Sequence, residues 1–229
     1  MKNSPPKAYI FDVFGTLTDW RTSIARKVNS VFPDVDSIAF AVAWRGEYQP
    51  AMERIRSGNR GYISLDQIHS ENLERVLKAN DLFPLDPETH QKLSKAWERL
   101  DIWPDVKPGL KALKEKGFIA PCSNGSIALM TRLARHAGLP WDCILGADIA
   151  QDYKPKPEVY QASCRALGLS GEEVMMVAAH NDDLVAAEKE GLQTCFIARP
   201  TEHGPDQTID LKPTGNWTRE ITILTELAT

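Results

Sequence analysis

Four short segments of the chain are apolar almost throughout, and they predict the strands of a buried parallel sheet. A strand with one wet face alternates apolar and polar residues, whereas continuous apolarity is typical of a strand covered on both faces. The four segments are Ala8–Phe11, Phe118–Cys122, Val174–Ala178 and Thr194–Ile197.

Helical patterns alternate with the last three of these strands. A glycine follows each pattern closely, and glycine accepts the left-handed conformation that often ends a helix. The helices are predicted over residues 127–137, 157–167 and 183–190, before Gly138, Gly168 and Gly191. Strands that alternate with helices indicate βαβ units, so we expect an α/β fold with a Rossmann-like, doubly wound parallel sheet.

The segment from about residue 20 to residue 100 holds helical stretches and no convincing strand. Ser64–Gln67 has the spacing of a capping box, Asp86-Pro87 places a capping residue before proline, and Ser57–Asn59 and Leu82–Pro84 interrupt the helices. A block inserted after the first strand lies at the carboxyl ends of the strands, where α/β folds bind ligands. We therefore expect a core of residues 1–18 and 101–229 and an inserted helical cap domain, residues 19–100.

Composition narrows the class of protein. The 229 residues suffice for one large domain or one domain with an insert. A net charge of −4 provides no basic face for nucleic acid. No apolar run approaches the ~20 residues that cross a bilayer, and none precedes the first strand, so we expect neither a membrane span nor a signal peptide. The four cysteines are widely spaced, which favours a cytoplasmic protein over a disulfide-stapled secreted one.

Polar residues follow the first two strands where each strand ends. Asp12 closes the first strand and is followed by Gly15 and Thr16. From this stretch alone, Asp12 is either a turn cap or a catalytic group at the ligand crevice. Ser123-Asn124-Gly125 follows the second strand and is either an ordinary helix cap or an anion site.

Taken in order, these stretches resemble the motifs of the haloacid dehalogenase superfamily, and within it the (S)-2-haloacid dehalogenase branch. The matching stretches are Asp12-Val-Phe-Gly-Thr16, Trp44-Arg45, Ser123-Asn124-Gly125, Lys154-Pro-Lys-Pro-Glu-Val-Tyr160 and Asp183. The resemblance implies that Asp12 is a covalent nucleophile. Phosphatases of the superfamily carry a second acid two residues later to protonate the leaving alcohol, but this chain has Phe14 there. A halide leaves as a stable anion without a proton, so Phe14 favours the dehalogenase branch.

The resemblance implies that Lys154 holds Asp12 ionised by attraction between opposite charges, with the Tyr160 hydroxyl near that pair. Lys156 is the competing lysine, but the spacing to Tyr160 favours Lys154.

On the substrate side, the resemblance implies that Ser123 contacts the substrate carboxylate and that Asn124 shares the halide pocket. Arg45, in the cap, would accept the leaving halide, because a weakly hydrated planar cation can meet an anion in a dry pocket. The weaker alternatives are Arg54, Arg56 and Arg60. The expected substrate-binding set is Thr16, Arg45, Ser123, Asn124 and Phe14.

The fourth motif departs from the family pattern. Ala178 and His180 stand where many haloacid dehalogenases have serine and asparagine, and Asp183 is kept. A histidine at a strand end can take a proton from water near neutral pH, so His180 is the expected base of the second chemical step. The alternative is that His180 only hydrogen-bonds the region of Asp183 or Lys154. Asp182-Asp183 suggests Mg²⁺, but Lys154 neutralises local charge, so we expect no metal and no cofactor.

The resemblance therefore implies a hydrolase that converts short (S)-2-haloalkanoic acids into 2-hydroxy acids through an aspartyl ester, inverting C2; the preference for the (S) form comes from the resemblance alone. The resemblance also allows a homodimer. Two alternatives stay open: a Mg²⁺-dependent phosphatase or phosphonate hydrolase of the same superfamily, and a non-catalytic member that binds a metabolite or a protein.

Overall fold

The centre of the molecule is a six-stranded sheet in which every neighbouring pair of strands is parallel. The computed structural model describes residues 4–58 and 60–229. The sheet order is β5 (Leu145–Gly146), β4 (Phe118–Ser123), β1 (Ala8–Phe11), β6 (Val174–Ala178), β7 (Gln193–Ile197) and β8 (Arg219–Ile221). The predicted α/β class and the four predicted strands are confirmed, and these strands form the middle of the sheet.

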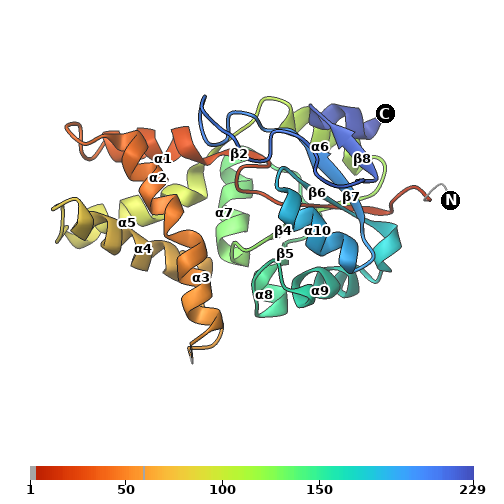
Figure 1. The fold of residues 1–229 in the computed structure, drawn as a ribbon, viewed down its shortest axis with the longest axis horizontal. Helices are drawn as coiled ribbons and strands as arrows, with labels where there is room; N and C mark the ends of the chain where they lie inside the picture. The colour runs from red at the N-terminus through yellow and green to blue at the C-terminus, as the bar shows by residue number, and fades with distance from the viewer. Residues whose placement is uncertain (1–3, 59) are drawn as a thin grey trace.

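Helices cover both faces of this sheet (Figure 1). Alternate residues of β1 serve the two faces. Tyr9 and Phe11 pack with one set of helices, Ala8 and Ile10 with the other. Both faces are therefore dry, which explains why the strands are apolar throughout. The first face carries α6 (Val106–Lys114) and the short helix η3 (Leu224–Ala228); the second carries α9 (Pro157–Leu167) and α10 (Asn181–Lys189).

The predicted helix ends are confirmed for α7 (Ile127–Ala137) and α9. Both end at a glycine with φ of +67°, Gly138 and Gly168. Helix α10 begins at Asn181, two residues before the predicted start. The remaining short elements of the core are α8 (Ala147–Ala150) and η2 (Gly171–Glu173). In the part of the chain that the structure describes, no helix combines the length and apolarity of a membrane span.

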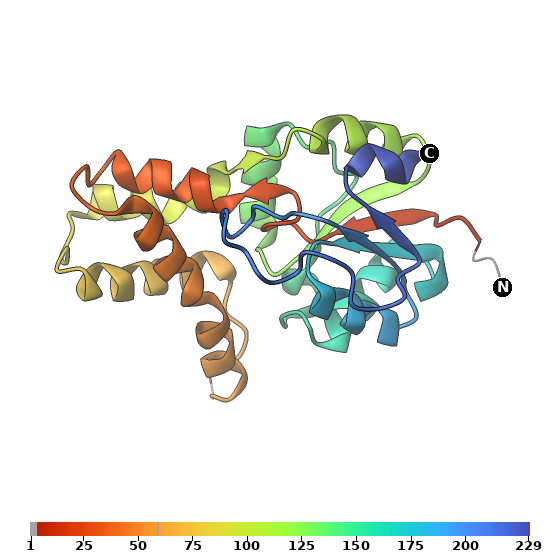
Figure 2. The ribbon, with the colours of Figure 1, turned by 45° about the horizontal axis from the view of Figure 1, so that its top comes forward.

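The inserted helical segment lies at the end of the molecule opposite both termini (Figures 1 and 2). Its elements are α1 (Trp20–Asn29), α2 (Ser37–Gly46), α3 (Tyr48–Arg56), α4 (Leu65–Ala79), α5 (Pro87–Ser94) and η1 (Lys95–Arg99). Two short antiparallel strands, β2 (Thr18–Asp19) and β3 (Asp101–Ile102), pair where the chain leaves the core and where it returns. The expected helical cap is thus confirmed.

One predicted helix cap is confirmed and one is wrong. Asp86 caps α5 by accepting a hydrogen bond from the Thr89 backbone, with proline at the first turn. Ser64 precedes α4 but makes no side-chain cap bond. The Gln67 amide donates to Glu71 instead of reaching back, so the capping box does not form. The predicted interruption at Ser57–Asn59 falls partly outside the described residues, because Asn59 is not among them.

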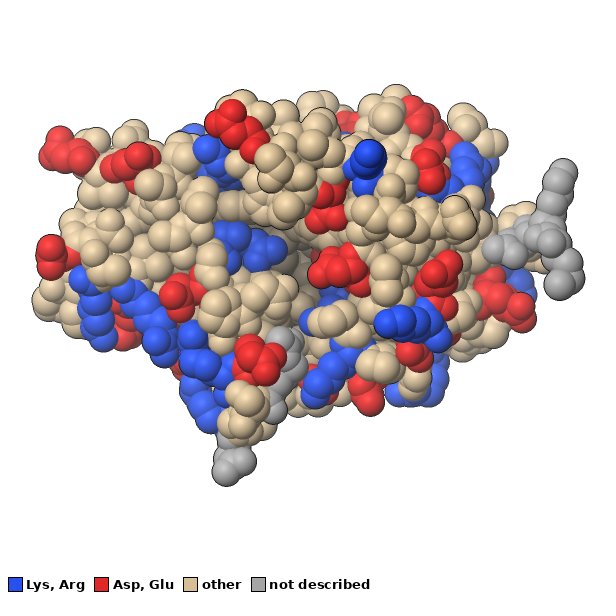
Figure 3. All heavy atoms as spheres, in the orientation of Figure 1, with Lys and Arg blue, Asp and Glu red and all other residues tan. Residues whose placement is uncertain are grey.

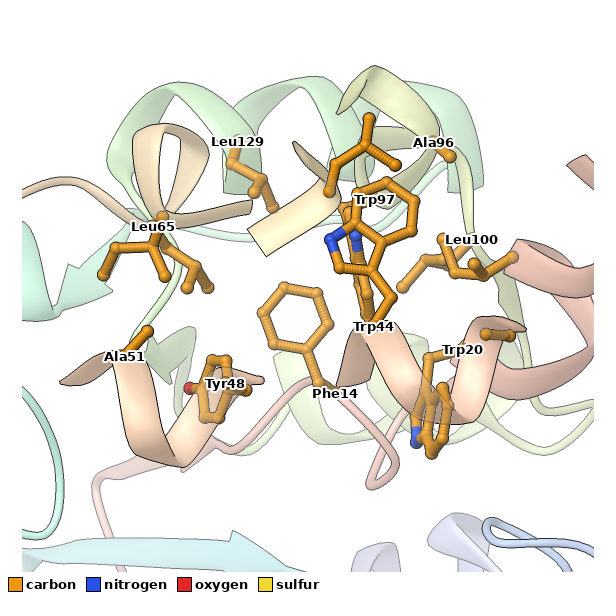
Figure 4. Packing of buried hydrophobic residues seen from close by; sticks show 14 of the residues in the cluster. Phe14, Trp20, Trp44, Tyr48, Ala51, Leu65, Ala96, Trp97, Leu100 and Leu129 are labelled. Carbon is orange, nitrogen blue, oxygen red and sulfur yellow. The ribbon is translucent and has the colours of Figure 1, made fainter. Parts of the chain in front are cut away.

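An aromatic cluster joins the cap to the core (Figure 4). Phe14 comes from the turn after β1, yet its ring lies edge-on to Trp97 at 5.8 Å and to His69 at 6.1 Å. His69 in turn stacks on Trp97 at 4.4 Å, and Trp44 packs beside them. The core turn that follows Asp12 is therefore anchored inside the cap.

Candidate active site

A cleft of about 850 Å³ lies between the cap and the core, at the carboxyl ends of the strands. In the space-filling view, cations gather on its cap side and acids on its core side (Figure 3). Of the expected site residues, those that line the cleft are Asp12, Phe14, Arg45, Asn124, Lys154, His180 and Asp183.

The strand ends bring Asp12, Lys154 and Asp183 together, as expected for the first, third and fourth motifs. Lys154 Nζ lies 2.8 Å from Asp12 Oδ1 and also donates to Asp183 Oδ2. The Tyr160 hydroxyl donates to the other oxygen of Asp183. Tyr160 is fully buried, so it supports the pair through Asp183 and does not reach the cleft.

This arrangement keeps Asp12 ionised. Burial alone raises the pKa of Asp12, but the Lys154 charge and a hydrogen bond with His180 outweigh burial and hold that pKa well below its usual value. The two carboxylates likewise raise the pKa of Lys154 against the opposing effect of burial. Burial raises the pKa of Asp183, so Asp12 is the more strongly ionised of the two acids that share Lys154.

Two residues expected to bind substrate are placed elsewhere. Thr16 is fully buried; its Oγ1 donates to Asp12 Oδ2 over 2.7 Å and accepts from the Ala179 backbone over 2.9 Å. Thr16 therefore holds the carboxylate in place. Ser123 is also fully buried, and its Oγ accepts from the Gly125 backbone. Neither side chain lines the cleft, so their expected contacts with substrate stay predictions.

Asn124 does reach the cleft, and it also fixes the neighbouring motif. Its Oδ1 accepts a hydrogen bond from the Lys154 backbone over 2.7 Å. The second and third motifs are thus tied to each other directly, which sets the position from which Lys154 reaches Asp12.

His180 lies between two carboxylates, and one of them was not predicted. Its Nδ1 is 3.3 Å from Asp12 Oδ2, and its Nε2 is 3.0 Å from Glu202 Oε2. Glu202 is almost fully buried and also accepts from Trp20 Nε1 over 3.0 Å. Burial lowers the pKa of His180, but hydrogen bonds to Asp12 and Glu202 hold it well above its ordinary 6.5. The two carboxylates therefore favour the protonated form of His180 in the resting site.

Glu202 can approach this closely only because residue 15 is glycine. A Cβ on Gly15 would lie 2.0 Å from Glu202 Oε1, and the Gly15 φ of +90° is itself unfavourable for other residues. Gly15 thus makes room for the acid that binds His180. A signal was present in the sequence, since Glu202 follows shortly after the fourth predicted strand, on the same edge of the sheet.

Arg45 contributes the cation of the cap side. Its guanidinium lies over the Tyr48 ring at 4.2 Å and near the Trp20 ring at 5.8 Å. Among the described residues no carboxylate pairs with Arg45, and its buried Nε has no acceptor. Aromatic faces hold the guanidinium without neutralising it, so it is free to receive an anion. Tyr48 and Trp20 line the cleft and were not predicted.

Two of the three competing cap arginines pair with carboxylates outside the cleft. Arg54 pairs with Glu47 and Arg60 with Glu71, both at exposed positions. The side chain of Arg56 lies outside the described part of the structure.

An irregular segment, residues 198–218, crosses the site between β7 and β8; we call it the strap. Arg199 holds the start of the strap: it donates a hydrogen bond to the Thr16 carbonyl and forms a bidentate salt bridge with Asp105. Asn181 fixes its far end with five hydrogen bonds, whose partners are Asp210 (twice), Lys212, Thr214 and Trp217. The strap carries Glu202 and His203 into the site and Ile209, Asp210 and Thr214 to the mouth of the cleft.

The acids of the site do not fit a divalent cation. Lys154 Nζ already lies within hydrogen-bonding distance of both Asp12 and Asp183. A metal ion bound by the same two carboxylates would meet that ammonium group and be repelled. Phe14 occupies the position where a further acid could have helped, and in residues 4–58 and 60–229 no three His, Cys, Asp or Glu side chains form a metal-binding group.

Comparison with known proteins gives consistent matches. A family model described as a haloacid dehalogenase-like hydrolase matches residues 6–191. The chain is 32% identical over 196 residues to the (S)-2-haloacid dehalogenase of Pseudomonas sp. (strain YL), covering 84% of this chain and 83% of that protein.

Solved structures match over nearly the whole chain. A defluorinating L-2-haloacid dehalogenase shares 47% sequence identity with a TM-score of 0.95, covering 97% of this chain and 94% of the other. A second L-2-haloacid dehalogenase shares 43% identity with a TM-score of 0.93, covering 97% and 98%.

Proposed function

Because the chain belongs to the haloacid dehalogenase-like hydrolase family, we propose that it hydrolyses (S)-2-haloalkanoic acids to 2-hydroxy acids and halide. One observation carries the proposal. Asp12 is held ionised by Lys154 at the floor of the cleft, while Phe14 leaves no proton donor at the place where a phosphatase needs one. Such a site suits a leaving group that departs as a stable anion.

The first step is displacement at C2. The Asp12 carboxylate attacks C2 from the side opposite the halogen, a C–O bond forms, and the C–X bond breaks with its electron pair on the halide. Lys154 and Thr16 orient the carboxylate. Arg45 receives the halide on the cap side, where its guanidinium has no competing carboxylate among the described residues, with Asn124 beside the pocket.

Ester formation also changes His180. Before the reaction His180 is an imidazolium between two carboxylates; afterwards Asp12 is a neutral ester and only Glu202 remains. The loss of one carboxylate lowers the pKa of His180, so the imidazolium releases its proton to water in the cleft. The base needed for the second step is thus produced by the first step.

The second step is hydrolysis of the ester. Neutral His180 accepts a proton from water while the hydroxide adds to the Asp12 carbonyl carbon, and the intermediate expels the 2-hydroxy acid, which takes the remaining proton. Asp12 and the His180 imidazolium are restored. Over the cycle, one haloacid and one water give one hydroxy acid, one halide and one proton. C2 is attacked once, so its configuration is inverted.

A single turnover in ¹⁸O-water tests the covalent ester. The label should enter the Asp12 carboxylate and be missing from the first hydroxy acid, because water attacks the carbonyl carbon and not C2. Asp12→Asn should abolish halide release from 2-chloropropionate. Label in the first product, or halide release by Asp12→Asn, would refute the ester route; binding without turnover in the native protein would favour the non-catalytic alternative.

Three finer expectations belong to the same proposal. Residues 19–100 act as one cap body over a core of 1–18 and 101–229, which the pairing of β2 with β3 at the chain crossings supports. The protein works in the cytoplasm, consistent with four free cysteines. It forms a homodimer, which light scattering after gel filtration tests directly.

A further inference from the structure

Three exposed aliphatic side chains line the cleft, one from each of three elements. Val42 on α2, Val185 on α10 and Ile209 on the strap all line the cavity that contains Asp12. Their exposed fractions are 45%, 39% and 56%. Three elements from both sides of the cleft thus present aliphatic side chains to the same opening, although each side chain remains largely open to water.

The same cavity contains the charged groups of the site. Asp12, Lys154, Arg45 and His180 all line it, and they suffice for the carboxylate and the carbon–halogen bond. A cavity of about 850 Å³ has the size of sites that hold drug-like ligands, about 300–1,000 Å³. A haloacetate has only a few non-hydrogen atoms and leaves the mouth unused.

The chemistry of the mouth limits what can fill it. Valine and isoleucine side chains form no hydrogen bonds, so they bind only an apolar group favourably. Asp182 and Asp210 line the same region of the cavity and disfavour a second negative charge. An uncharged alkyl group meets both conditions, and the carbon that bears the halogen can carry one.

We infer that Val42, Val185 and Ile209 form a subsite for the alkyl substituent at C2, and that the preferred substrates are medium-chain 2-haloalkanoic acids. The inference rests on the proposed function. The strap residue Ile209 lies beyond residues 6–191, the part of the chain matched by the family model, so this wall of the subsite is a feature of the segment outside that match.

The test measures kcat/KM for halide release from the (S)-2-bromo acids of propionate, butanoate, hexanoate and octanoate. Full burial of one methylene corresponds to about a fourfold gain, and half-burial to about twofold. We expect kcat/KM to rise about twofold per methylene, about eightfold from propionate to hexanoate. 2-Bromosuccinate, which carries a carboxylate where 2-bromobutanoate has a methyl group, should react at least about tenfold more slowly because of Asp182 and Asp210.

Substitutions in the subsite test whether its residues cause the dependence of kcat/KM on chain length. Ile209→Ser and Val42→Ser should each lower the hexanoate-to-propionate ratio of kcat/KM by about threefold. Ile223→Ser is the matched control, since Ile223 is 47% exposed but does not line the cavity, and it should leave the ratio unchanged. Melting temperatures verify that all three variants fold.

The possible results distinguish failure of the alkyl subsite from failure of the proposed dehalogenase activity. Halide release that falls with each added methylene, or a ratio that Ile209→Ser and Val42→Ser leave unaltered, overturns the subsite and keeps the dehalogenase. Halide release from none of the acids overturns both.

Discussion

Two basic side chains contact Asp12, and each of them also contacts a second carboxylate. Lys154 and the His180 imidazolium contact Asp12, while Asp183 and Glu202 hold these two cations from behind. Neutralising Asp12 therefore leaves each cation with one remaining carboxylate. Because the ordinary pKa of lysine lies far above that of histidine, the proposed mechanism has Lys154 keep its proton while His180 loses its own.

Replacing His180 by asparagine should separate the two steps. His180→Asn keeps the proposed nucleophile but removes the proposed base, so halide should appear in a burst of about one equivalent, followed by turnover about 10²–10⁴-fold slower. Mass spectrometry of the protein should show the ester on Asp12.

Proton release gives a second measurement on the same variant. With a pH indicator, the native protein should release a proton together with the halide, whereas His180→Asn should release halide without a proton. The control is His136→Asn, at an exposed position on α7, which should match the native protein. A proton released by His180→Asn during the burst would contradict the proposed role of His180.

Replacing Glu202 by glutamine tests its effect on His180. Glu202→Gln keeps an oxygen for Trp20 but removes one carboxylate beside the imidazolium, so the pKa of His180 should fall. A raised folded-state pKa stabilises the protein below the unfolded value of 6.5, and this contribution disappears as pH rises through the folded value. In Glu202→Gln the loss should begin at lower pH.

NMR titration of His180 and melting temperatures between pH 5 and pH 10 measure both effects. Glu220→Gln, at an exposed position, is the control. An unchanged His180 titration in Glu202→Gln would show that Glu202 does not set its charge.

The sequence could identify the residues of this site that lie inside recognisable motifs, and not those that act from a distance. Asp12 and His180 each follow a strand end, and Lys154 has a motif partner in Tyr160 six positions later. Glu202 lies in an irregular segment, and only the course of the strap brings it beside Gly15. The motif located Thr16 beside Asp12 but could not give the direction of its side chain, which depends on neighbours such as the Ala179 backbone.

At the scale of elements, the strap is a long irregular segment, and a single residue holds its far end. The Asn181 side chain makes four of the five bonds that hold its far end, with Asp210, Lys212, Thr214 and Trp217 as partners. Since Asn181 directly follows His180, the anchor of the strap and the proposed base occupy adjacent positions in the chain.

Removing this anchor should loosen the strap before it affects the sheet. Asn181→Ala leaves several buried polar groups without partners, so we expect a loss of about 1–3 kcal/mol in the free energy of unfolding. Hydrogen exchange should accelerate in residues 205–217, and kcat/KM should fall as Glu202 and Ile209 lose their positions. The control is Asn80→Ala, which removes a single bond at the end of α4.

Protection of residues 205–217 that stays at the native level in Asn181→Ala would show that other contacts hold the strap.

How well the elements could be predicted depended on their length and surroundings. The central strands β1, β4, β6 and β7 are long enough, and dry enough on both faces, to leave an apolar run. The edge strands β5 and β8 have two and three residues and carry no pattern of their own; tertiary pairing with β4 and β7 defines them. The failed capping box at Ser64 has a similar cause, since the Gln67 side chain found another partner.

At the scale of the whole molecule, one side chain joins the nucleophile turn to the cap. Phe14 is only 5% exposed, and its ring is enclosed by the cap residues His69 and Trp97. Its place two positions after Asp12 means that the cap cannot shift without moving the backbone next to the nucleophile. The packing of Phe14 therefore links the position of the cap to that of the turn beside Asp12.

Replacing Phe14 by aspartate should not produce a phosphatase. The new carboxylate would be enclosed by aromatic rings without a partner, and the lost ring alone accounts for about 3–5 kcal/mol of unfolding free energy. We expect a large drop in the urea midpoint and no hydrolysis of p-nitrophenyl phosphate with Mg²⁺ present. Phe14→Leu, which keeps an apolar side chain, should lose about 1.5 kcal/mol or less.

Magnesium-dependent phosphatase turnover by a stable Phe14→Asp protein would contradict this account.

The embedding of Phe14 also bears on how such proteins can diverge. A related protein that evolved from halide release to phosphate release would need a different residue at position 14. It would first have to rebuild the packing between cap and core, because Phe14, which the proposal links to the leaving group, also makes that contact. Innovation in the reaction would then begin with mutations in the helical insert, far in sequence from the aspartate whose chemistry they permit.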